Sequence, residues 1–305
     1  MSPNNEITKS LVEMKPAHDF FIGIDSDGCA FDTMEVKHKE CFIPNIIQYW
    51  GLAAVSKYAR NAAEFVNLYS KWRGVNRWPA LTMCFDLLEE WPEVQKRGVS
   101  IPKAPHVRAF VAQSQYPHSN EGLKAYMEAN PGEADLETAL QWSYAVNATV
   151  TEIVHNVPPF PFLRESLQKL QSKADMIVVS ATPVEALVRE WQEHDIDQYV
   201  RVIAGQEMGT KSEHLKMAAQ GKYAPNHTLM IGDALGDLKA ARSIGALFFP
   251  INPGEEDASW QLFYEEAADK FLNEEYEGEY EAKLIAEFEK HLPETPPWKQ
   301  NHSAG

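Results

Sequence analysis

The sequence has few cysteines and no long run of apolar residues. Cys29, Cys41 and Cys84 are the only cysteines in 305 residues, and their spacing fits neither a disulfide framework nor a zinc site. An odd, sparse set of this kind is typical of a reducing compartment. No apolar stretch approaches the roughly 20 residues that cross a bilayer, and the first residues lack an apolar signal core. We therefore expect a cytoplasmic protein without a membrane partner.

Basic residues are also scarce. The chain has 28 Lys and Arg against 44 Asp and Glu, a formal net charge of −16. Broad nucleic-acid binding is therefore not expected, because a phosphate backbone requires a basic face. A small anionic substrate stays compatible with this charge, since a divalent cation and one or two lysines can make a pocket locally positive.

Five short apolar runs are each followed closely by a polar residue, glycine or proline. A run of this kind bounded by a turn signal predicts a buried strand, and helical periodicity between the runs predicts βαβ units. We therefore predict an α/β fold with a Rossmann-like parallel-sheet core. The expected strands are 20–24, 176–179, 202–204, 229–231 and 247–249, and the expected helices between them are 184–194, 212–220 and 235–244.

The alternation of strands and helices is interrupted once, over residues 34–157. Helical periodicity dominates there, and the region ends at the stiff segment Pro158-Pro159-Phe160-Pro161. We predict a large, all-helical cap domain at 34–157, inserted between core segments 1–33 and 158–305, close to the edge where open α/β sheets bind ligands. Its expected helices are 45–57, 62–71, 80–90 and 136–155; the tail is expected to be helical at 260–272 and 280–292 and loose over 293–305.

Asp25 and Asp27 follow the first predicted strand directly. Side chains two apart on an extended segment point the same way, so both carboxylates can face one pocket. One can attack a phosphorus atom while the other protonates the leaving oxygen. The alternative is an ordinary acidic turn. A calcium-binding EF-hand loop is excluded, because it needs glycine at its sixth position and Gly28 is the fourth residue from Asp25.

A second acidic pair follows the predicted strand 229–231. Asp233 and Asp237 lie four residues apart across a helix start, so they can share one face of its first turn. With Asp25 they supply the hard oxygen ligands that Mg²⁺ prefers. Helix capping is the alternative role for either residue.

Two further segments could bind an anion. Ser180 and Ala181 directly follow the strand 176–179 and precede a helix, where backbone N–H groups bind anions; capping is again the alternative. Lys211 opens another helix, where it could neutralise the carboxylates and hold a phosphate. Its surroundings nearly match a nucleotide-binding P-loop, but Thr210 stands where that motif requires glycine.

Taken together, these four segments resemble the haloacid dehalogenase-like hydrolases. The resemblance is carried by Asp25-x-Asp27-Gly28 with a following acid at Asp32, by Ser180, by Lys211 and by Gly232-Asp233-x-x-x-Asp237, over about 180 residues of core. Because Asp27 is acidic, the chain is more similar to the phosphatase and phosphomutase branch, with phosphoglycolate phosphatases and β-phosphoglucomutases, than to the dehalogenases.

The resemblance implies a role for each residue. Asp25 would be the nucleophile and a Mg²⁺ ligand, and Asp27 the general acid/base with its backbone carbonyl on the metal. Ser180, Ala181 and Lys211 would bind phosphate, Asp233 would bind Mg²⁺ and Asp237 would support it. The substrate would be a small phosphorylated metabolite.

Two questions stay open at the level of sequence. A phosphotransferase or mutase, and a non-catalytic binding protein on the same fold, are alternatives to a phosphatase. Arg73 and Arg77 in the insert could bind an anionic or sugar-like leaving group, or could be a solvated helix end. The oligomeric state cannot be derived from the sequence.

Overall fold

The computed structural model describes residues 8–113 and 115–300 and divides into two compact units. The core unit contains the chain up to Met34 and Asn156–Pro293, and the helical unit contains Glu35–His155 and the chain from Glu294 onward. The last segment differs from the predicted core range 158–305, because the described residues after Pro293 pack in the helical unit. Among the described residues, no helix has the length and apolar character needed to span a membrane.

The core unit is built on one sheet of five parallel strands, which confirms the predicted α/β fold. The strands lie in the order β3-β2-β1-β4-β5, so β1 is central, and Ile22 of β1 pairs with Met176 of β2 and Leu229 of β4. The chain therefore reverses its winding direction between β1 and β4, the place where open α/β sheets bind ligands. The strands are β1 (Phe20–Ile24), β2 (Ala174–Val179), β3 (Val202–Ala204), β4 (Thr228–Gly232) and β5 (Leu247–Pro250).

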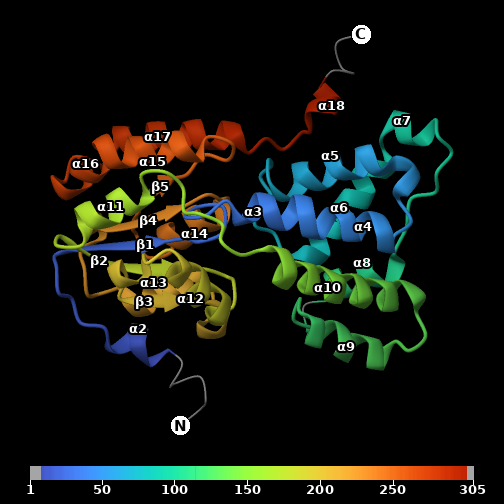
Figure 1. The fold of residues 1–305 in the computed structure, drawn as a ribbon, viewed down its shortest axis with the longest axis horizontal. Coiled ribbons are helices and arrows are strands. Elements are labelled where there is room, and N and C mark those ends of the chain that lie inside the picture. The colour runs from blue at the N-terminus through green and yellow to red at the C-terminus, as the bar shows by residue number, and fades with distance from the viewer. Residues whose placement is uncertain (1–7, 114, 301–305) are drawn as a thin grey trace. The chain divides into compact units, whose positions relative to one another are not determined.

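Alternate residues of the strands enter two separate hydrophobic layers, one on each face of the sheet. Ile22 and Ile231 belong to the layer with Trp191 and Trp260, whereas Phe21 belongs to the opposite layer. Both faces are thus covered by helices, as Figure 1 shows. The core helices are α2 (Lys9–Glu13), α11 (Leu163–Leu170), α12 (Val184–Glu193), α13 (Lys211–Ala218), α14 (Leu235–Arg242), α15 (Glu256–Leu262), α16 (Ala268–Leu272) and α17 (Glu279–His291), with a π-helical turn (Phe263–Ala267) between α15 and α16.

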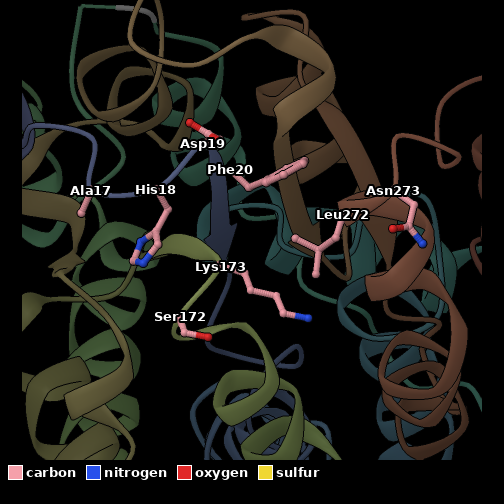
Figure 2. Close-up of a pocket in the computed structure, with 8 residues that line it drawn as sticks. All are labelled: Ala17, His18, Asp19, Phe20, Ser172, Lys173, Leu272 and Asn273. Carbon is pink, nitrogen blue, oxygen red and sulfur yellow. The ribbon is translucent and has the colours of Figure 1, made fainter.

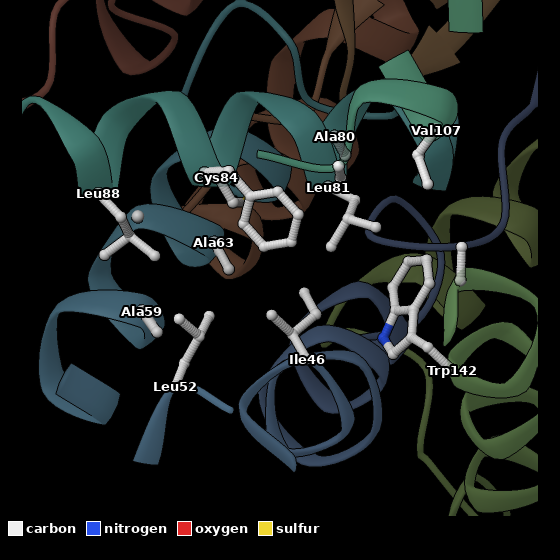
Figure 3. Close-up of a cluster of buried hydrophobic side chains, with 14 of the residues drawn as sticks. Ile46, Leu52, Ala59, Ala63, Ala80, Leu81, Cys84, Leu88, Val107 and Trp142 are labelled. Carbon is white, nitrogen blue, oxygen red and sulfur yellow. The ribbon is translucent and has the colours of Figure 1, made fainter. Parts of the chain in front are cut away.

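The helical unit has its own hydrophobic core. Figure 3 shows part of it, with Ile46, Leu81 and Trp142 among the side chains that meet between the helices. Its described residues contain no strand. After α3 (Thr33–Val36), where the two units join, come a π-helical turn (Lys37–Phe42), α4 (Ile43–Tyr49), α5 (Ser56–Asn67), α6 (Arg77–Glu89), α7 (Pro92–Gln95), α8 (Pro105–Ala112), α9 (Asn120–Ala129), α10 (Ala134–Ile153) and α18 (Pro297–Gln300).

Two expectations about the insert and the tail are wrong in detail. The helix predicted at 45–57 is broken into α4 and α5, because Gly51 adopts a φ of 66°, which ends a helix and favours glycine. The tail expected to be loose packs on the helical unit as far as Lys299. There the Trp298 ring stacks on Trp91 at 4.1 Å between centroids and meets Phe65 edge-on at 5.6 Å. Residues 301–305 lie outside the described part of the chain.

Candidate active site

The predicted acidic residues meet at the carboxyl ends of two neighbouring strands. Asp25 follows β1, and its N–H donates to the Ile231 carbonyl of β4 at 3.0 Å. Asp233 follows β4 directly. Parallel pairing of β1 with β4 therefore brings together two residues more than 200 positions apart, and both are almost fully buried, at 4% and 2% exposure.

Lys211 joins two of these carboxylates. Its Nζ donates to Asp25 Oδ2 at 2.7 Å and to Asp237 Oδ1 at 2.6 Å. Thr210 caps the helix that Lys211 opens, because its hydroxyl accepts the Glu213 N–H while Glu213 accepts the Thr210 N–H. The lysine thus sits on a firmly capped first turn, with its ammonium group directed at the ends of β1 and β4.

Gly232 lets Asp237 approach the end of β4. A Cβ atom at this glycine would lie 2.4 Å from Asp237 Cβ and 2.6 Å from its Cγ, closer than any real contact. Asp237 Oδ2 also accepts the Ala234 N–H at 3.1 Å. The aspartate therefore caps α14 and binds Lys211 at once, so the two roles considered for it from sequence are not exclusive.

Burial and like charges shift the pKa values of this cluster. Burial raises the pKa of Asp25 well above its usual range; Lys211 opposes the shift, and Asp237 and Asp233 add to it. Burial also raises the pKa of Asp237, against the effect of Lys211. Burial alone would lower the pKa of Lys211, but Asp237, Asp25 and Asp233 outweigh it and raise that pKa. A single ammonium group therefore faces three buried carboxylates.

This imbalance suits a bound cation. Asp25, Asp233 and Asp237 each offer a carboxylate oxygen, and these oxygens lie within 4.8 Å of one another. Three hard oxygen donors at a sheet edge fit Mg²⁺, which binds through a few carboxylates and keeps positions for water and phosphate. These three carboxylates therefore fit Mg²⁺, the cation predicted from the sequence.

Asp27 lies beside this cluster and is held by two hydroxyl groups. Thr182 donates to Asp27 Oδ2 at 2.6 Å, and Thr33 donates to Oδ1. A carboxylate that accepts two hydrogen bonds has a fixed direction. The sequence patterns single out neither threonine for the site, and only the folded arrangement brings both hydroxyl groups to Asp27.

Ser180 ends β2 two residues before Thr182. It is 2% exposed, its N–H donates to the Ala204 carbonyl at 3.0 Å, and its Oγ accepts the Thr182 N–H at 3.2 Å. The Thr182 carbonyl in turn accepts the Gln206 N–H at 3.0 Å, which ties this loop to the one that leads to Lys211. Ala181 is exposed between them. The core residues predicted for the site therefore lie in the loops or first helical turns that follow the carboxyl ends of the strands.

The two arginines of the helical unit make internal contacts. Arg73 is 5% exposed, and its Nη1 donates to the Leu68 carbonyl at 2.8 Å. Arg77 Nη1 donates to Ser143 Oγ and Asn147 Oδ1, both at 2.8 Å, and its guanidinium lies over the Phe42 ring. Burial lowers the pKa of Arg77 to about 10. Arg73 thus fixes a loop, whereas Arg77 is a partly buried cation whose hydrogen bonds go to neutral groups.

One pocket of the core unit lies away from these residues. Its volume is about 520 Å³, and Figure 2 shows His18, Phe20 and Lys173 among its lining side chains. Phe20 begins β1 and Lys173 immediately precedes β2, so the pocket is at the amino end of the sheet, opposite Asp25. The carboxylate cluster at the carboxyl end of the sheet, and not this pocket, contains the residues suited to catalysis.

The sequence also matches a known family. Residues 110–251 match the family model described as haloacid dehalogenase-like hydrolase. The matched segment includes Ser180, Lys211, Asp233 and Asp237 but begins after Asp25 and Asp27, so those two are placed by the structure. No curated protein matches the chain.

Several solved structures are similar to the chain at low sequence identity. A haloacid dehalogenase-like family protein from Streptococcus pneumoniae has 18% identity and a TM-score of 0.41, covering 88% of this chain and 98% of that one. A provisionally assigned phosphoglycolate phosphatase from Lactobacillus delbrueckii subsp. bulgaricus has 15% identity and a TM-score of 0.48, with 85% and 98% coverage. A provisionally assigned β-phosphoglucomutase from Thermotoga maritima has 16% identity and a TM-score of 0.38, with 83% and 97% coverage. No residue role or substrate follows from these likenesses.

Proposed function

We propose that this haloacid dehalogenase-like hydrolase cleaves a small phosphate monoester, with Asp25 as the nucleophile and Mg²⁺ as the cofactor. One observation carries the proposal. The carboxylates of Asp25, Asp233 and Asp237 converge at the ends of β1 and β4 with one lysine between them. Such a cluster is costly to bury unless a cation and an anionic substrate complete it, which favours phosphoryl transfer over a structural role.

Asp25, Asp233 and the Asp27 backbone carbonyl would hold Mg²⁺, with Asp237 supporting them. When bound, the cation would neutralise charge on the phosphoryl oxygens. Lys211 and Ser180 would hold the same group from the other loops. Nucleophilic attack and proton transfer would be carried out by side chains of the protein.

Asp25 attacks the phosphorus atom through a carboxylate oxygen, and the bond from phosphorus to the ester oxygen breaks. Asp27 gives its proton to that oxygen, so the product alcohol leaves neutral and Asp25 carries the phosphoryl group. Asp27 then accepts a proton from water as the water attacks phosphorus and frees Asp25. Thr33 and Thr182 keep Asp27 directed at the oxygen in both steps.

We further propose that the helical unit acts as the cap and selects the leaving group. Arg77 supports this proposal better than Arg73, because it is less deeply buried and its guanidinium donates to the neutral acceptors Ser143 Oγ and Asn147 Oδ1. A partly buried cation of this kind favours an anionic ligand. Replacing Arg77 with Leu should raise KM for the natural substrate more than it raises KM for an aryl phosphate whose leaving group is uncharged.

The proposal is tested by phosphate release from an aryl phosphate and from a panel of phosphorylated metabolites, with added Mg²⁺ or with a chelator. We expect release that the chelator abolishes and that Asp25→Asn loses almost completely. Asp257→Asn is the matched control, because Asp257 is exposed on α15. Release that persists in Asp25→Asn would refute the mechanism. An isomerised sugar phosphate without free phosphate would identify a mutase instead.

A further inference from the structure

Ser26 stands between the proposed nucleophile and the proposed general acid. Its side chain is fully buried. The hydroxyl donates to Glu190 Oε2 at 3.0 Å and accepts the Trp191 Nε1–H at 3.0 Å. Both partners lie near the end of α12, so one helix holds the Ser26 side chain by a donor and an acceptor together.

The backbone of Ser26 is bonded on both sides as well. Its N–H donates to Asp25 Oδ1 at 2.8 Å. Its carbonyl lies within hydrogen-bonding range of three N–H groups, those of Cys29, Ala30 and Phe31, at 3.3, 2.8 and 3.1 Å. Any rotation of Ser26 would therefore move the Asp25 carboxylate and the turn after Asp27 together.

A second tryptophan supports the same loop from another helix. Trp260 of α15 is fully buried, and its Nε1–H donates to the Cys29 carbonyl at 2.7 Å. Trp191 is equally buried. The loop that carries both catalytic aspartates is thus attached to the layer beneath it by two indole N–H groups.

Packing alone does not account for these contacts. A phenylalanine would fill much of the volume of Trp191, and burying an indole N–H is costly unless it finds an acceptor. Glu190 also places a carboxylate next to a loop that already carries Asp25 and Asp27. Both features are accounted for if the direction of the Ser26 hydroxyl matters to the reaction.

We propose that Glu190 and Trp191 are positioning residues: they fix the Ser26 hydroxyl and thereby the directions of Asp25 and Asp27. Neither residue touches the reacting atoms. The inference rests on the proposed function, because it concerns the geometry of the proposed nucleophile and general acid. A displacement of reacting groups by about 1 Å can cost about 10²-fold in rate, so the effect should appear in kcat.

The test measures kcat and KM for an aryl phosphate in Ser26→Ala, Trp191→Phe, Glu190→Ala and Glu190→Gln. We expect kcat to fall by roughly 10- to 100-fold in the first three, with KM little changed. Glu190→Gln should recover most of the rate, because its amide oxygen still accepts the serine hydroxyl. Combining Ser26→Ala with Trp191→Phe should cost no more than Ser26→Ala alone, since both remove the same hydrogen bond.

Trp142→Phe is the control for loss of a buried indole. Trp142 is 1% exposed in the helical unit, and its Nε1 has no hydrogen-bond partner among residues 8–113 and 115–300, so kcat should stay unchanged. A melting temperature is recorded for every variant. Variants with the wild-type kcat and a lowered melting temperature would show a purely structural role and overturn the inference alone. A wild-type protein without turnover on any phosphate ester would overturn the proposed function and this inference with it.

Discussion

The Nζ of Lys211 lies 2.6 Å from Asp237 Oδ1, and the Asp237 carboxylate is completely buried. The same ammonium group reaches Asp25 at 2.7 Å. Without Mg²⁺, Lys211 is the cation that makes this acidic cluster compatible with a folded core.

Lys211→Met should therefore lower both stability and activity. Removing one partner of a buried ion pair typically costs about 3–5 kcal/mol, and Lys211 is partly exposed, so we expect the lower end of that range. Added Mg²⁺ should restore part of the loss. Urea unfolding with and without Mg²⁺ measures it, and Lys216→Met, on the exposed face of the same helix, is the control. Equal stability of the two variants would contradict the prediction.

Gly232→Ala should disturb the cluster without changing any charge. The added methyl group would lie 2.4 Å from Asp237 Cβ, so Asp237 or the strand end must shift. We expect about 1–3 kcal/mol of destabilisation, weaker Mg²⁺ binding and lower kcat. Gly236→Ala is the matched control: its Cβ meets nothing within 4 Å, and alanine in α14 should be neutral or stabilising. If Gly232→Ala and Gly236→Ala had similar kcat values, Asp237 would tolerate the shift and the prediction would be wrong.

Asp175 should make stability depend on pH in the acid range. Burial would raise the pKa of Asp175, but hydrogen bonds from Tyr223, Ala17, His18 and Arg201 outweigh it and hold the pKa below the ordinary value of 3.8. The carboxylate therefore stabilises the fold above that pH, and this contribution is lost as pH falls through the folded-state pKa.

Asp175→Asn should accordingly be less stable than wild type near neutral pH, and the difference should shrink as pH falls below about 4. Urea unfolding as a function of pH measures both quantities. Asp257→Asn, which removes an exposed carboxylate, should follow the wild-type curve. A wild-type advantage that grows at low pH would give the opposite sign and refute the argument.

Trp298→Ala should destabilise the helical unit. The ring stacks on Trp91, and the neighbouring Lys299 pairs with Glu90. Because Trp298 is only partly buried, we expect a loss of about 1–3 kcal/mol, below the cost of a full core truncation. Thermal unfolding followed by tryptophan fluorescence measures it. Ile153→Ala, at a position 44% exposed on α10, should change stability little. An unaffected Trp298→Ala would mean that the segment does not contribute to the fold.

The core and much of the proposed site could be predicted from sequence because their signals are local. Each strand is a short apolar run, and Asp25 and Asp233 directly follow two of these strands, so each aspartate can be identified from its own strand alone. Parallel strands end at the same edge, which is enough to expect that these residues meet. The assigned catalytic roles nevertheless remain proposals.

The residues that support the site could not be predicted in this way. Thr33, Thr182, Glu190 and Trp191 act through hydrogen bonds whose partners lie on other elements, and only the folded arrangement reveals them. The break at Gly51 depends on one positive φ angle, which a helical pattern of apolar residues does not reveal. The packing of Trp298 is likewise hidden, because a short, proline-rich end has no helical periodicity.

The docking of Trp298 also changes how the helical unit can be handled as a module. Its fold is completed by residues from the far end of the sequence, so residues 35–155 are not the whole of it. A fragment cut at those positions would leave the faces of Trp91 and Phe65 uncovered. A chimera that exchanges the insert alone would pair the new helices with the old C-terminal segment. Transplanting the unit intact requires two pieces of chain, the insert and the short C-terminal segment that begins at Glu294.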